Sequence, residues 1–567
     1  MGWSSINRKP MTRARAWAVT ALIVAAPLVT LFAGAAQSAP AAVDRGESIY
    51  LLGLLGSGAP LEASRRPSGL RVTGADAACV NCHQRSGLGS YEGYAGYVRI
   101  PPIAGQYLFH ARGATSAEPV LPYVESMHSN RDPYTDATLA RAIRDGVDSQ
   151  GRPLNELMPR YTMTDADMSA LIAYLKSLDK LQAPGAKEAV LHIATVVTPE
   201  ADPARRAAML DVMQHYFADK NEFPIGPSAQ MRTSGKTGYA KSMFMPHHQW
   251  KLHVWDLSGP PSQWREQLEA HLGQEPVLAV LSGLGGMNWV PVHDFCEQHK
   301  LPCLFPNIDV PVNQDHDFYT LYFSRGVLLE AELIGRALSG SDAAGTPRTV
   351  YQLYRQGDSG EAAAAVLAAA LKEHGINVRT ESLGGIRAGK DLSEALHRVS
   401  GASALVMWLR PDDLRVLDQP PAPGVSVFVS GLMGGLEHSP LPESWRSRTQ
   451  MAYPYDLPER RNLRMRYPLA WFSMRHIPIV DERLQADTYL ACGLLAETLS
   501  HMADNLAQPY IVELLQNSVE HRLINTGYYP RLGLGPNQQF VSKGGYIVHF
   551  AEPAGSDLVA DSDWVVP

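Results

Sequence analysis

Two cysteines and a histidine form the most informative group of residues in the sequence. They stand together in the segment Cys79-Val80-Asn81-Cys82-His83. Two thiols at this spacing, followed at once by an imidazole, match covalent haem c attachment, in which each thiol adds across a haem vinyl group and the histidine binds the iron. The segment therefore predicts one covalently bound haem c whose iron is held by His83.

Two other chemistries also use paired cysteines. A tetrahedral zinc site needs further sulfur or nitrogen ligands close by, but Cys296, Cys303 and Cys492 all lie more than two hundred residues away. A thioredoxin-like dithiol belongs to a strand-to-helix unit, whereas residues 69–78 end in a short helix-like run. Covalent haem is therefore favoured over zinc and over dithiol chemistry.

The N-terminal residues differ in composition from the rest of the chain. Four basic residues precede an apolar run from Ala16 to Ala36, and small residues suited to signal peptidase end at Ala39. Residues 1–39 are therefore predicted to be a signal peptide that directs the protein to the periplasm. The alternative is an uncleaved membrane anchor, because the apolar run is long enough to span a bilayer.

The remaining composition is typical of a soluble globular protein, with 45% hydrophobic and 19% charged residues. A length of 567 residues indicates about three compact units. The formal charge of −7 becomes −7 − 4 = −11 once the four basic leader residues are removed. This acidic balance argues against nucleic-acid binding and is compatible with a basic electron-transfer partner.

Short helices are predicted after the cysteine motif. Asp136 is placed to cap a helix over residues 137–145, which Gly146 would end. Thr164 and Asp167 form a capping signal before a run of apolar residues at helical spacing. Such helices could enclose a haem edge.

The iron needs a sixth ligand if the haem serves only electron transfer. Met158 stands in the loop before the last predicted helix, and Pro159 prevents a helix there, which would hold the thioether pointing into the pocket. Met158 is therefore the predicted distal ligand. Other residues of a suitable type are Met127, Met163, Met168, His110 and His128. Of these, Met168 lies on the apolar helical face and is best explained as packing.

Residues 44–181 resemble a class I c-type cytochrome domain. The matching stretches are Gly46-Glu-Ser-Ile-Tyr50, the cysteine motif, Met158-Pro-Arg-Tyr161 and Ala173-Tyr-Leu175. The resemblance implies an all-α domain. This chain departs from the compact members of the family by a long insert, Gly87–Pro133, which is rich in Gly, Tyr and Pro.

The resemblance also implies roles for individual residues. Cys79 and Cys82 would form the thioether bonds, His83 would be the proximal iron ligand and Met158 the distal one. Ligation by His and Met raises the reduction potential relative to two histidines and leaves no open position for substrate chemistry. Arg85 follows the motif closely and could pair with a haem propionate; a solvated glycine-rich loop is the alternative.

After a short polar linker at residues 182–187, the pattern changes to alternating strands and helices. Strand-like runs at 190–197, 277–281 and 349–353 are each followed by a helical pattern. Such repetition predicts parallel sheets with helices on both faces. Residues 188–567 are therefore expected to form a bilobed α/β domain that follows the all-α domain.

The order of these features resembles type I periplasmic solute-binding proteins of the branched-chain amino-acid receptor kind. The matching stretches include Val280-Leu-Ser-Gly-Leu-Gly-Gly286 and Gln356-Gly-Asp-Ser-Gly360, the second followed by an Ala-rich helix. The resemblance implies a small-molecule ligand between the lobes, held by hydroxyl and backbone N–H groups in the loop that Ser282 and Gly283 occupy here.

Three further residues are candidates for the cleft by position alone. Ser324 and Arg325 open a predicted helix, and Arg410 follows a predicted strand. An arginine in a cleft suggests an anionic ligand group, because its guanidinium binds a carboxylate in a bidentate manner. A salt bridge at the surface of a lobe is the alternative for each arginine.

Export would also change the chemistry of the remaining cysteines, because disulfides form in oxidising compartments. Cys296 and Cys303 are close enough in sequence for a local disulfide. Cys492 lies in an apolar helical run and is expected to be a buried free thiol.

Three functions fit these features. The favoured one is single-haem electron transfer with a redox partner such as a periplasmic dehydrogenase or another cytochrome, joined to a module that binds a ligand or partner. The second is a solute-binding receptor or a redox or ligand sensor in which the haem is secondary. The third is an enzyme that oxidises a ligand between the lobes, but no Gly-x-Ser-x-Gly or His-Glu-x-x-His signature supports catalysis.

Overall fold

The computed structural model covers the chain with gaps. It describes residues 42–65, 68–89, 91–92, 98–109, 131–178, 186–187, 190–222, 248–314, 317–340, 349–384, 389–502, 506–521, 525–535 and 538–567. The predicted leader and most of the insert 87–133 lie outside these residues. Among the helices that are described, none is both long and apolar enough to cross a membrane.

Residues 42–178 form a mainly helical part with its own hydrophobic core, made only of residues between Ile49 and Leu178. Its helices are α1 (Ala42–Leu52), η1 (Gly74–Ala77), α2 (Val80–His83), α3 (Gly105–Phe109), α5 (Asp136–Asp145) and α6 (Asp165–Ser177). Helices α1 and α6 pack closely because Gly46 has no side chain: a Cβ there would lie 2.2 Å from the carbonyl oxygen of Ala170. Next to this contact the rings of Tyr50 and Tyr174 lie 5.2 Å apart.

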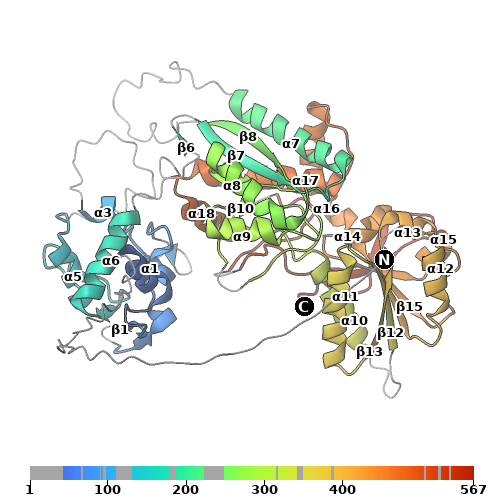
Figure 1. The fold of residues 1–567 in the computed structure, drawn as a ribbon, viewed down its shortest axis with the longest axis horizontal. Coiled ribbons are helices and arrows are strands. Elements are labelled where there is room, and N and C mark those ends of the chain that lie inside the picture. Colours follow the sequence, from blue (N-terminus) through green and yellow to red (C-terminus); the bar gives the residue numbers. More distant parts are fainter. Residues whose placement is uncertain are drawn as a thin grey trace, which may run out of the picture. The chain divides into compact units, whose positions relative to one another are not determined.

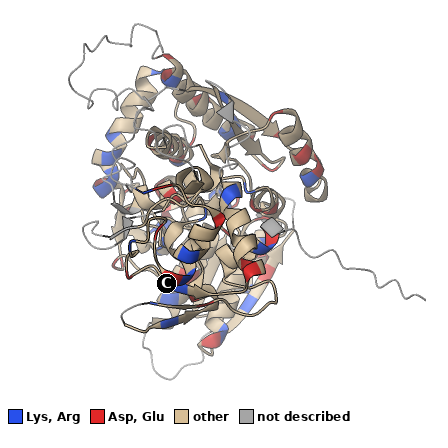
Figure 2. Ribbon diagram, turned by 90° about the vertical axis from the view of Figure 1, so that its left-hand side faces the viewer, with Lys and Arg blue, Asp and Glu red and all other residues tan. Residues whose placement is uncertain are grey.

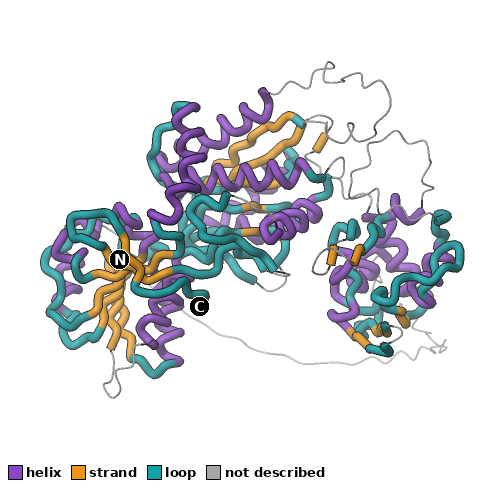
Figure 3. The backbone as a smooth tube through the Cα atoms, turned by 180° about the vertical axis from the view of Figure 1, so that it is seen from behind, coloured by secondary structure: helices purple, strands orange, loops and turns teal. Residues whose placement is uncertain are grey.

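The same part also contains strands, so the prediction of an all-α domain needs a correction. An antiparallel sheet has the order β2-β1-β5, and a second pair joins β3 to β4 (Figure 3). The strands are β1 (Glu62–Ser64), β2 (Arg71–Thr73), β3 (Tyr91–Glu92), β4 (Val98–Arg99) and β5 (Arg160–Thr162). Strand β5 begins two residues after Met158, so the sheet fixes one end of the loop that carries this methionine.

The predicted helix caps can be compared with the observed ones. The N-cap of α5 is Thr135, not the predicted Asp136, because the Thr135 and Thr138 side chains form a reciprocal capping box. Gly146 ends this helix in the left-handed conformation, as predicted. At the start of α6 the Thr164 side chain accepts a hydrogen bond from the backbone N–H of Asp167, also as predicted.

The rest of the chain forms two α/β lobes. Lobe I has a mostly parallel sheet of order β11-β10-β9-β7, with β8 beside β7 and the short β6 antiparallel to β7. Its strands are β6 (Ala186–Lys187), β7 (Val190–Val197), β8 (Gln249–Asp256), β9 (Ala279–Leu281), β10 (Cys303–Leu304) and β11 (Thr320–Leu321). Its first helices are α7 (Pro203–Glu222), η5 (Pro261–Gln263), α8 (Trp264–Gln274) and α9 (Val290–Gln298).

Lobe II has a sheet of order β13-β12-β14-β15-β16-β17-β18. Its first five strands are parallel, β17 is antiparallel to β16, and β18 is antiparallel to β17. The strands are β12 (Thr349–Arg355), β13 (Asn377–Leu383), β14 (Ala404–Trp408), β15 (Ser426–Ser430), β16 (Thr449–Tyr453), β17 (Tyr546–Phe550) and β18 (Leu558–Ala560). The helices are α10 (Val327–Gly340), α11 (Gly360–Glu373), α12 (Gly389–His397), α13 (Pro411–Arg415), α14 (Gly431–Gly434), η6 (Leu436–His438) and α15 (Glu443–Arg446). Helices α10 and α11 cover one face of the sheet, and α12, α13 and α15 lie on the other (Figure 1).

Three more helices return to lobe I: α16 (Pro458–Met474), α17 (Glu482–Ser500) and α18 (Gln508–His521). Helix α16 shares a small core with α7 through Val212 and Phe472, and Gln508 of α18 donates to the carbonyl of Leu278 beside β9. The chain therefore crosses between the lobes three times, near residues 322–326, 454–457 and 525–545.

The crossing segments are hydrogen-bonded to one another. Val541 donates its backbone N–H to the carbonyl of Tyr322 at 3.1 Å, and Asp456 donates to the carbonyl of Tyr528 at 2.8 Å. All three connections thus form one hydrogen-bonded hinge between the lobes.

Charged residues of both signs occur on helices throughout the described residues (Figure 2). Some are buried as pairs inside a lobe. Arg355, at the end of β12, is 4% exposed and its guanidinium donates to the carboxylate of Asp413 at 2.7 Å. Because removing either partner would leave an unpaired buried charge, such a pair fixes the local packing of lobe II.

Candidate haem site and inter-lobe pocket

The two cysteines and the histidine lie on one helical turn. Cys79 is the N-cap of α2, and Cys82 and His83 are its last residues. Gln84 has a φ of 63°, in the left-handed region, and ends the helix. The Asn81 side chain donates to a carbonyl oxygen of η1 at 2.8 Å, which holds the turn against the preceding segment. This local structure keeps both sulfurs and the imidazole on a short, fixed piece of backbone.

His83 is buried and its ring orientation is fixed. His83 is only 6% exposed, and its Nδ1 lies 3.1 Å from the carbonyl oxygen of Pro101. Since a carbonyl can only accept, Nδ1 carries the proton and Nε2 presents the lone pair. Burial lowers the pKa of His83 to about 4, so the imidazole is neutral near pH 7. A neutral ring held by an outer hydrogen bond is what a metal-binding histidine requires, and the residues therefore fit a haem iron.

The predicted distal ligand lies on the same core. Met158 is half-buried and packs against the hydrophobic cluster that Cys79 and Val80 also contact. Its backbone N–H donates to the carbonyl of Asn155 at 3.1 Å, and the guanidinium of Arg160 donates to the Met158 carbonyl. The loop is thus held on both sides of the methionine, and Met158 stays the predicted distal ligand.

The competing candidates divide into two groups. Met168 is 2% exposed inside the core on α6, in agreement with its interpretation as packing, and Met163 packs partly buried against the same core. His110, Met127 and His128 lie outside the described residues.

Arg85 and Ser86, the second and third residues after His83, contact lobe I. The Arg85 guanidinium lies over the ring of Phe318, 4.5 Å from its centre. The backbone N–H and the hydroxyl of Ser86 donate to the two carboxylate oxygens of Glu513, at 2.9 and 2.5 Å. Burial raises the pKa of Glu513 to about 7, although the bonds from Ser86 and the charge of Arg85 oppose this. The predicted pairing of Arg85 with a propionate stays a prediction.

A small pocket lies between the lobes. Residues from lobe I, lobe II and helix α17 line it: Pro306, Asn307, Ile308, Pro311, Phe323, Ser324, Gly326, Leu432, Tyr455, Arg483 and Asp487. Apolar residues and polar residues contribute to this lining in similar measure.

The charged groups of the pocket come from one face of α17. Arg483 and Asp487 are four residues apart, and the guanidinium donates to the Asp487 carboxylate at 2.9 Å. Tyr529 also donates to this carboxylate, at 3.2 Å. Burial raises the pKa of Asp487 to about 6 even though Arg483 opposes the shift. The sequence does not single out this pair, because Arg and Asp at this spacing resemble an exposed helical ion pair.

Among the residues predicted to bind the ligand, Ser324 lines the pocket and Ser282 supports it. Ser282 is fully buried, accepts a hydrogen bond from the Asn307 amide at 2.9 Å and donates to Thr488 at 3.1 Å. Its φ of 49° is uncommon for a residue other than glycine and indicates a constrained loop. Gly283 lies against Trp289, since a Cβ there would be 2.5 Å from the indole.

The two predicted arginines have protein partners. Arg325 pairs with Glu332 at 2.5 Å. Arg410 of lobe II pairs with Asp358 at 2.7 Å and, across the cleft, with Asp309 at 2.5 Å. Burial alone would raise the pKa of Asp309, but Arg410 holds it below its usual value. These contacts match the salt-bridge alternative for both arginines, and Arg410 joins the two lobes directly.

The cysteines beyond the haem motif are all buried thiols in this structure. Cys296 and Cys303 contact each other, and burial raises the pKa of Cys296. The disulfide between them stays a prediction. Burial likewise raises the pKa of Cys492, which is fully buried in α17.

Comparison with protein families identifies one part of the chain. Residues 72–179 match the Cytochrome c family. No curated protein matches the chain. One similar solved structure is a branched-chain amino acid ABC transporter protein from Thermus thermophilus with bound valine, at 9% identity and a TM-score of 0.49, covering 67% of this chain and 97% of that chain. Another is a fatty acid ABC transporter substrate-binding protein from Thermomonospora curvata, at 13% identity and a TM-score of 0.46, covering 68% of this chain and 95% of that chain. A solute-binding protein from Rhodopseudomonas palustris BisB5 in complex with 3,4-dihydroxy benzoic acid is also similar, at 11% identity and a TM-score of 0.48, covering 67% of this chain and 98% of that chain. Since these TM-scores lie below 0.5, the bilobed fold is inferred here from the strand order and the three crossings.

Proposed function

We propose that this chain is an exported, periplasmic c-type cytochrome with one covalent haem, joined to a two-lobed module that binds a small anionic molecule. Cys79 and Cys82 would carry the thioether bonds, and His83 and Met158 would hold the iron. When bound, the haem supplies reversible one-electron chemistry. The redox partner would be a periplasmic dehydrogenase or another cytochrome.

The state of His83 carries the electron-transfer part of the proposal. Its pKa of about 4 keeps the ring neutral, and the bond from Nδ1 to Pro101 leaves Nε2 for the iron. With Met158 on the other side, both axial positions would be filled, which favours electron transfer over oxygen chemistry. A signal peptide over residues 1–39 would deliver the chain to the compartment where haem c is attached.

The Arg483–Asp487 pair supports an anionic ligand for the module. A guanidinium has five N–H donors, so Arg483 can keep its bond to Asp487 and still bind a carboxylate in the pocket. Ser324, Tyr455 and Asn307 add hydroxyl and amide groups to the same lining. These groups suit a small organic acid or an amino acid.

A second function is a ligand or redox sensor, and the contact between Ser86 and Glu513 favours it. This contact links the turn that follows His83 with helix α18 of lobe I. A change in lobe I on ligand binding could therefore reach the haem surroundings and alter its potential.

Redox titration of the purified holo protein tests both parts. For the electron carrier we expect a single one-electron transition, one haem per chain and no carbon monoxide binding by the reduced form. Carbon monoxide binding without denaturation would show an open iron position and contradict it. The same titration with organic acids that bind separates carrier from sensor, because only a sensor changes potential with its ligand.

A further inference from the structure

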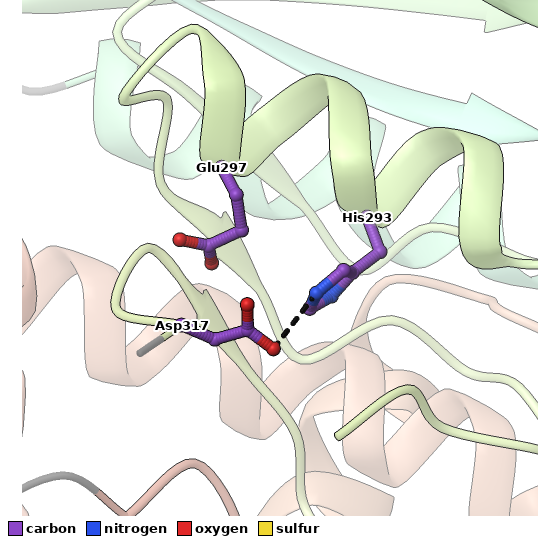
Figure 4. A group of neighbouring side chains, drawn as sticks. All are labelled: His293, Glu297 and Asp317. Atoms are coloured by element: carbon purple, nitrogen blue, oxygen red, sulfur yellow. Dashed lines mark ion pairs between the residues drawn. The ribbon is translucent and has the colours of Figure 1, made fainter. Parts of the chain in front are cut away.

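A cluster of three metal-ligand side chains lies in lobe I, apart from the inter-lobe pocket. His293 and Glu297 are four residues apart on α9 and therefore project from the same face of the helix. Asp317 stands just before β11 and faces them (Figure 4). One potential ligand atom from each residue lies within 4.8 Å of the other two.

The imidazole of His293 is fully buried and only partly satisfied. Nδ1 lies 2.9 Å from the hydroxyl of Tyr322. Nε2 lies 2.9 Å from a carboxylate oxygen of Asp317, but it makes no hydrogen bond of acceptable geometry. A buried ring nitrogen that is directed at carboxylates without an aligned hydrogen bond is uncommon in proteins, and a bound cation would satisfy all of these groups together.

The two carboxylates are already held in place by backbone N–H groups. Glu297 accepts from Thr320 at 2.8 Å and from Phe318 at 2.9 Å, one bond on each oxygen. Asp317 accepts from Gln314 at 2.9 Å. Because each carboxylate oxygen has a second lone pair, these bonds orient the carboxylates and leave a lone pair for a metal ion.

We infer that His293, Glu297 and Asp317 form a binding site for a divalent transition-metal ion, with Zn²⁺ as the best match. One imidazole nitrogen and two carboxylate oxygens suit zinc better than calcium or magnesium, which prefer oxygen ligands alone. Tyr322 would act as the outer partner that fixes the histidine. The ion would clamp α9 to the segment before β11, next to the first crossing between the lobes.

Equilibrium dialysis of the chelator-treated holo protein against Zn²⁺, with zinc and iron counted by mass spectrometry, tests the site. One zinc per haem iron is expected for the unmodified chain, with loss of this zinc in His293→Gln and Asp317→Asn. Tyr322→Phe should weaken binding by about 10–100-fold, as for other outer partners of metal ligands. His299→Gln is the matched control, because His299 lies just after the same helix and pairs with the exposed Glu269; it should bind zinc normally.

Two results would overturn the site. One is that the unmodified chain binds no zinc, and the other is that both ligand variants bind zinc as the unmodified chain does. In that case the three residues are only an ion pair and a backbone support. Thermal unfolding with and without Zn²⁺ guards against misfolded variants: zinc should raise the melting temperature of the unmodified chain and leave that of Asp317→Asn unchanged. Haem absorbance reports proper assembly in every variant.

Discussion

Glu513 of α18 accepts two hydrogen bonds from Ser86, the third residue after His83. Burial raises the pKa of this carboxyl from 4.5 to about 7. The folded chain therefore binds this proton more tightly than the unfolded chain. Its contribution to stability is present below pH 4.5 and is lost as the pH rises through 7.

Glu513→Gln should remove this pH dependence, because glutamine keeps the shape and acceptor oxygen but does not ionise. The stability difference between the variant and the unmodified chain should change by at most about 1.4 kcal/mol per pH unit, the value for one proton. Melting temperatures from pH 5 to 8 provide the measurement. Glu373→Gln, at an exposed position on α11, is the control. Parallel pH profiles for the unmodified chain and Glu513→Gln would contradict the assignment.

Replacement of Met158 by alanine should remove the sulfur ligand and lower the haem potential, because thioether ligation favours the reduced iron. The long-wavelength band of methionine-ligated oxidised haem should disappear. Met163→Ala, at a methionine that packs against the same core, should keep the band. If the band survives in Met158→Ala, another residue is the distal ligand.

Loss of Arg483 should destabilise the pocket, because Asp487 would be left buried and unpaired. Arg483→Met is expected to cost about 3–5 kcal/mol in the free energy of unfolding, and Arg483→Met with Asp487→Leu should recover most of it. Arg415→Met, which breaks an exposed pair with Asp412, should cost less than about 1 kcal/mol. Denaturant unfolding measures the free energy of unfolding of all three variants. If Arg483→Met and Arg415→Met lose the same free energy, the pocket pair is not desolvated.

The ion pair between Asp309 and Arg410 should hold the two lobes together at neutral pH. The lowered pKa of Asp309 means that the stabilisation is present above pH 3.8 and is lost as the pH falls through the folded value. Asp309→Asn should therefore increase amide hydrogen exchange in the facing segments 306–311 and 358–361. Asp412→Asn is the exposed control. If amide hydrogen exchange is unchanged in Asp309→Asn, other contacts hold the lobes together.

The buried thiols of Cys296 and Cys303 should be oxidised to a disulfide in protein recovered from an oxidising compartment. Alkylation before and after reduction, followed by mass spectrometry of peptides, reads the state of each cysteine. Cys492 should be alkylated without reduction once the protein is denatured. Free Cys296 and Cys303 in protein recovered from such a compartment would disprove the disulfide.

Local sequence signals predicted the elements well where pattern and packing agree. The apolar run 190–197 coincides with β7, and the helix expected after Thr164 is α6. The small strands β1, β2 and β5 could not be predicted, because segments of three residues carry too little periodicity. Strands β1 and β2 pair locally, and β5 joins β1 from a distant part of the chain.

The proposed haem site stands out in the sequence because its chemistry depends on adjacent residues, from Cys79 to His83. The inter-lobe pocket was harder to predict, since Arg483 comes from a helix that follows most of lobe II in sequence but packs on lobe I in the fold. Arg410 is a candidate for the cleft by its position after a strand, and its partner Asp309 is brought to it by tertiary structure alone. The predicted domain limits at 44–181 and 188–567 stay predictions.

The three crossings between the lobes also set an order for synthesis. Residues 42–178 are continuous in sequence, so their core can close as soon as this segment has left the ribosome. Lobe I cannot do so, because α7 must wait for α16 and α17, which are made after nearly all of lobe II. A chain cut after β16 would therefore leave both lobes incomplete, and they should mature as one folding unit, after the haem-binding part.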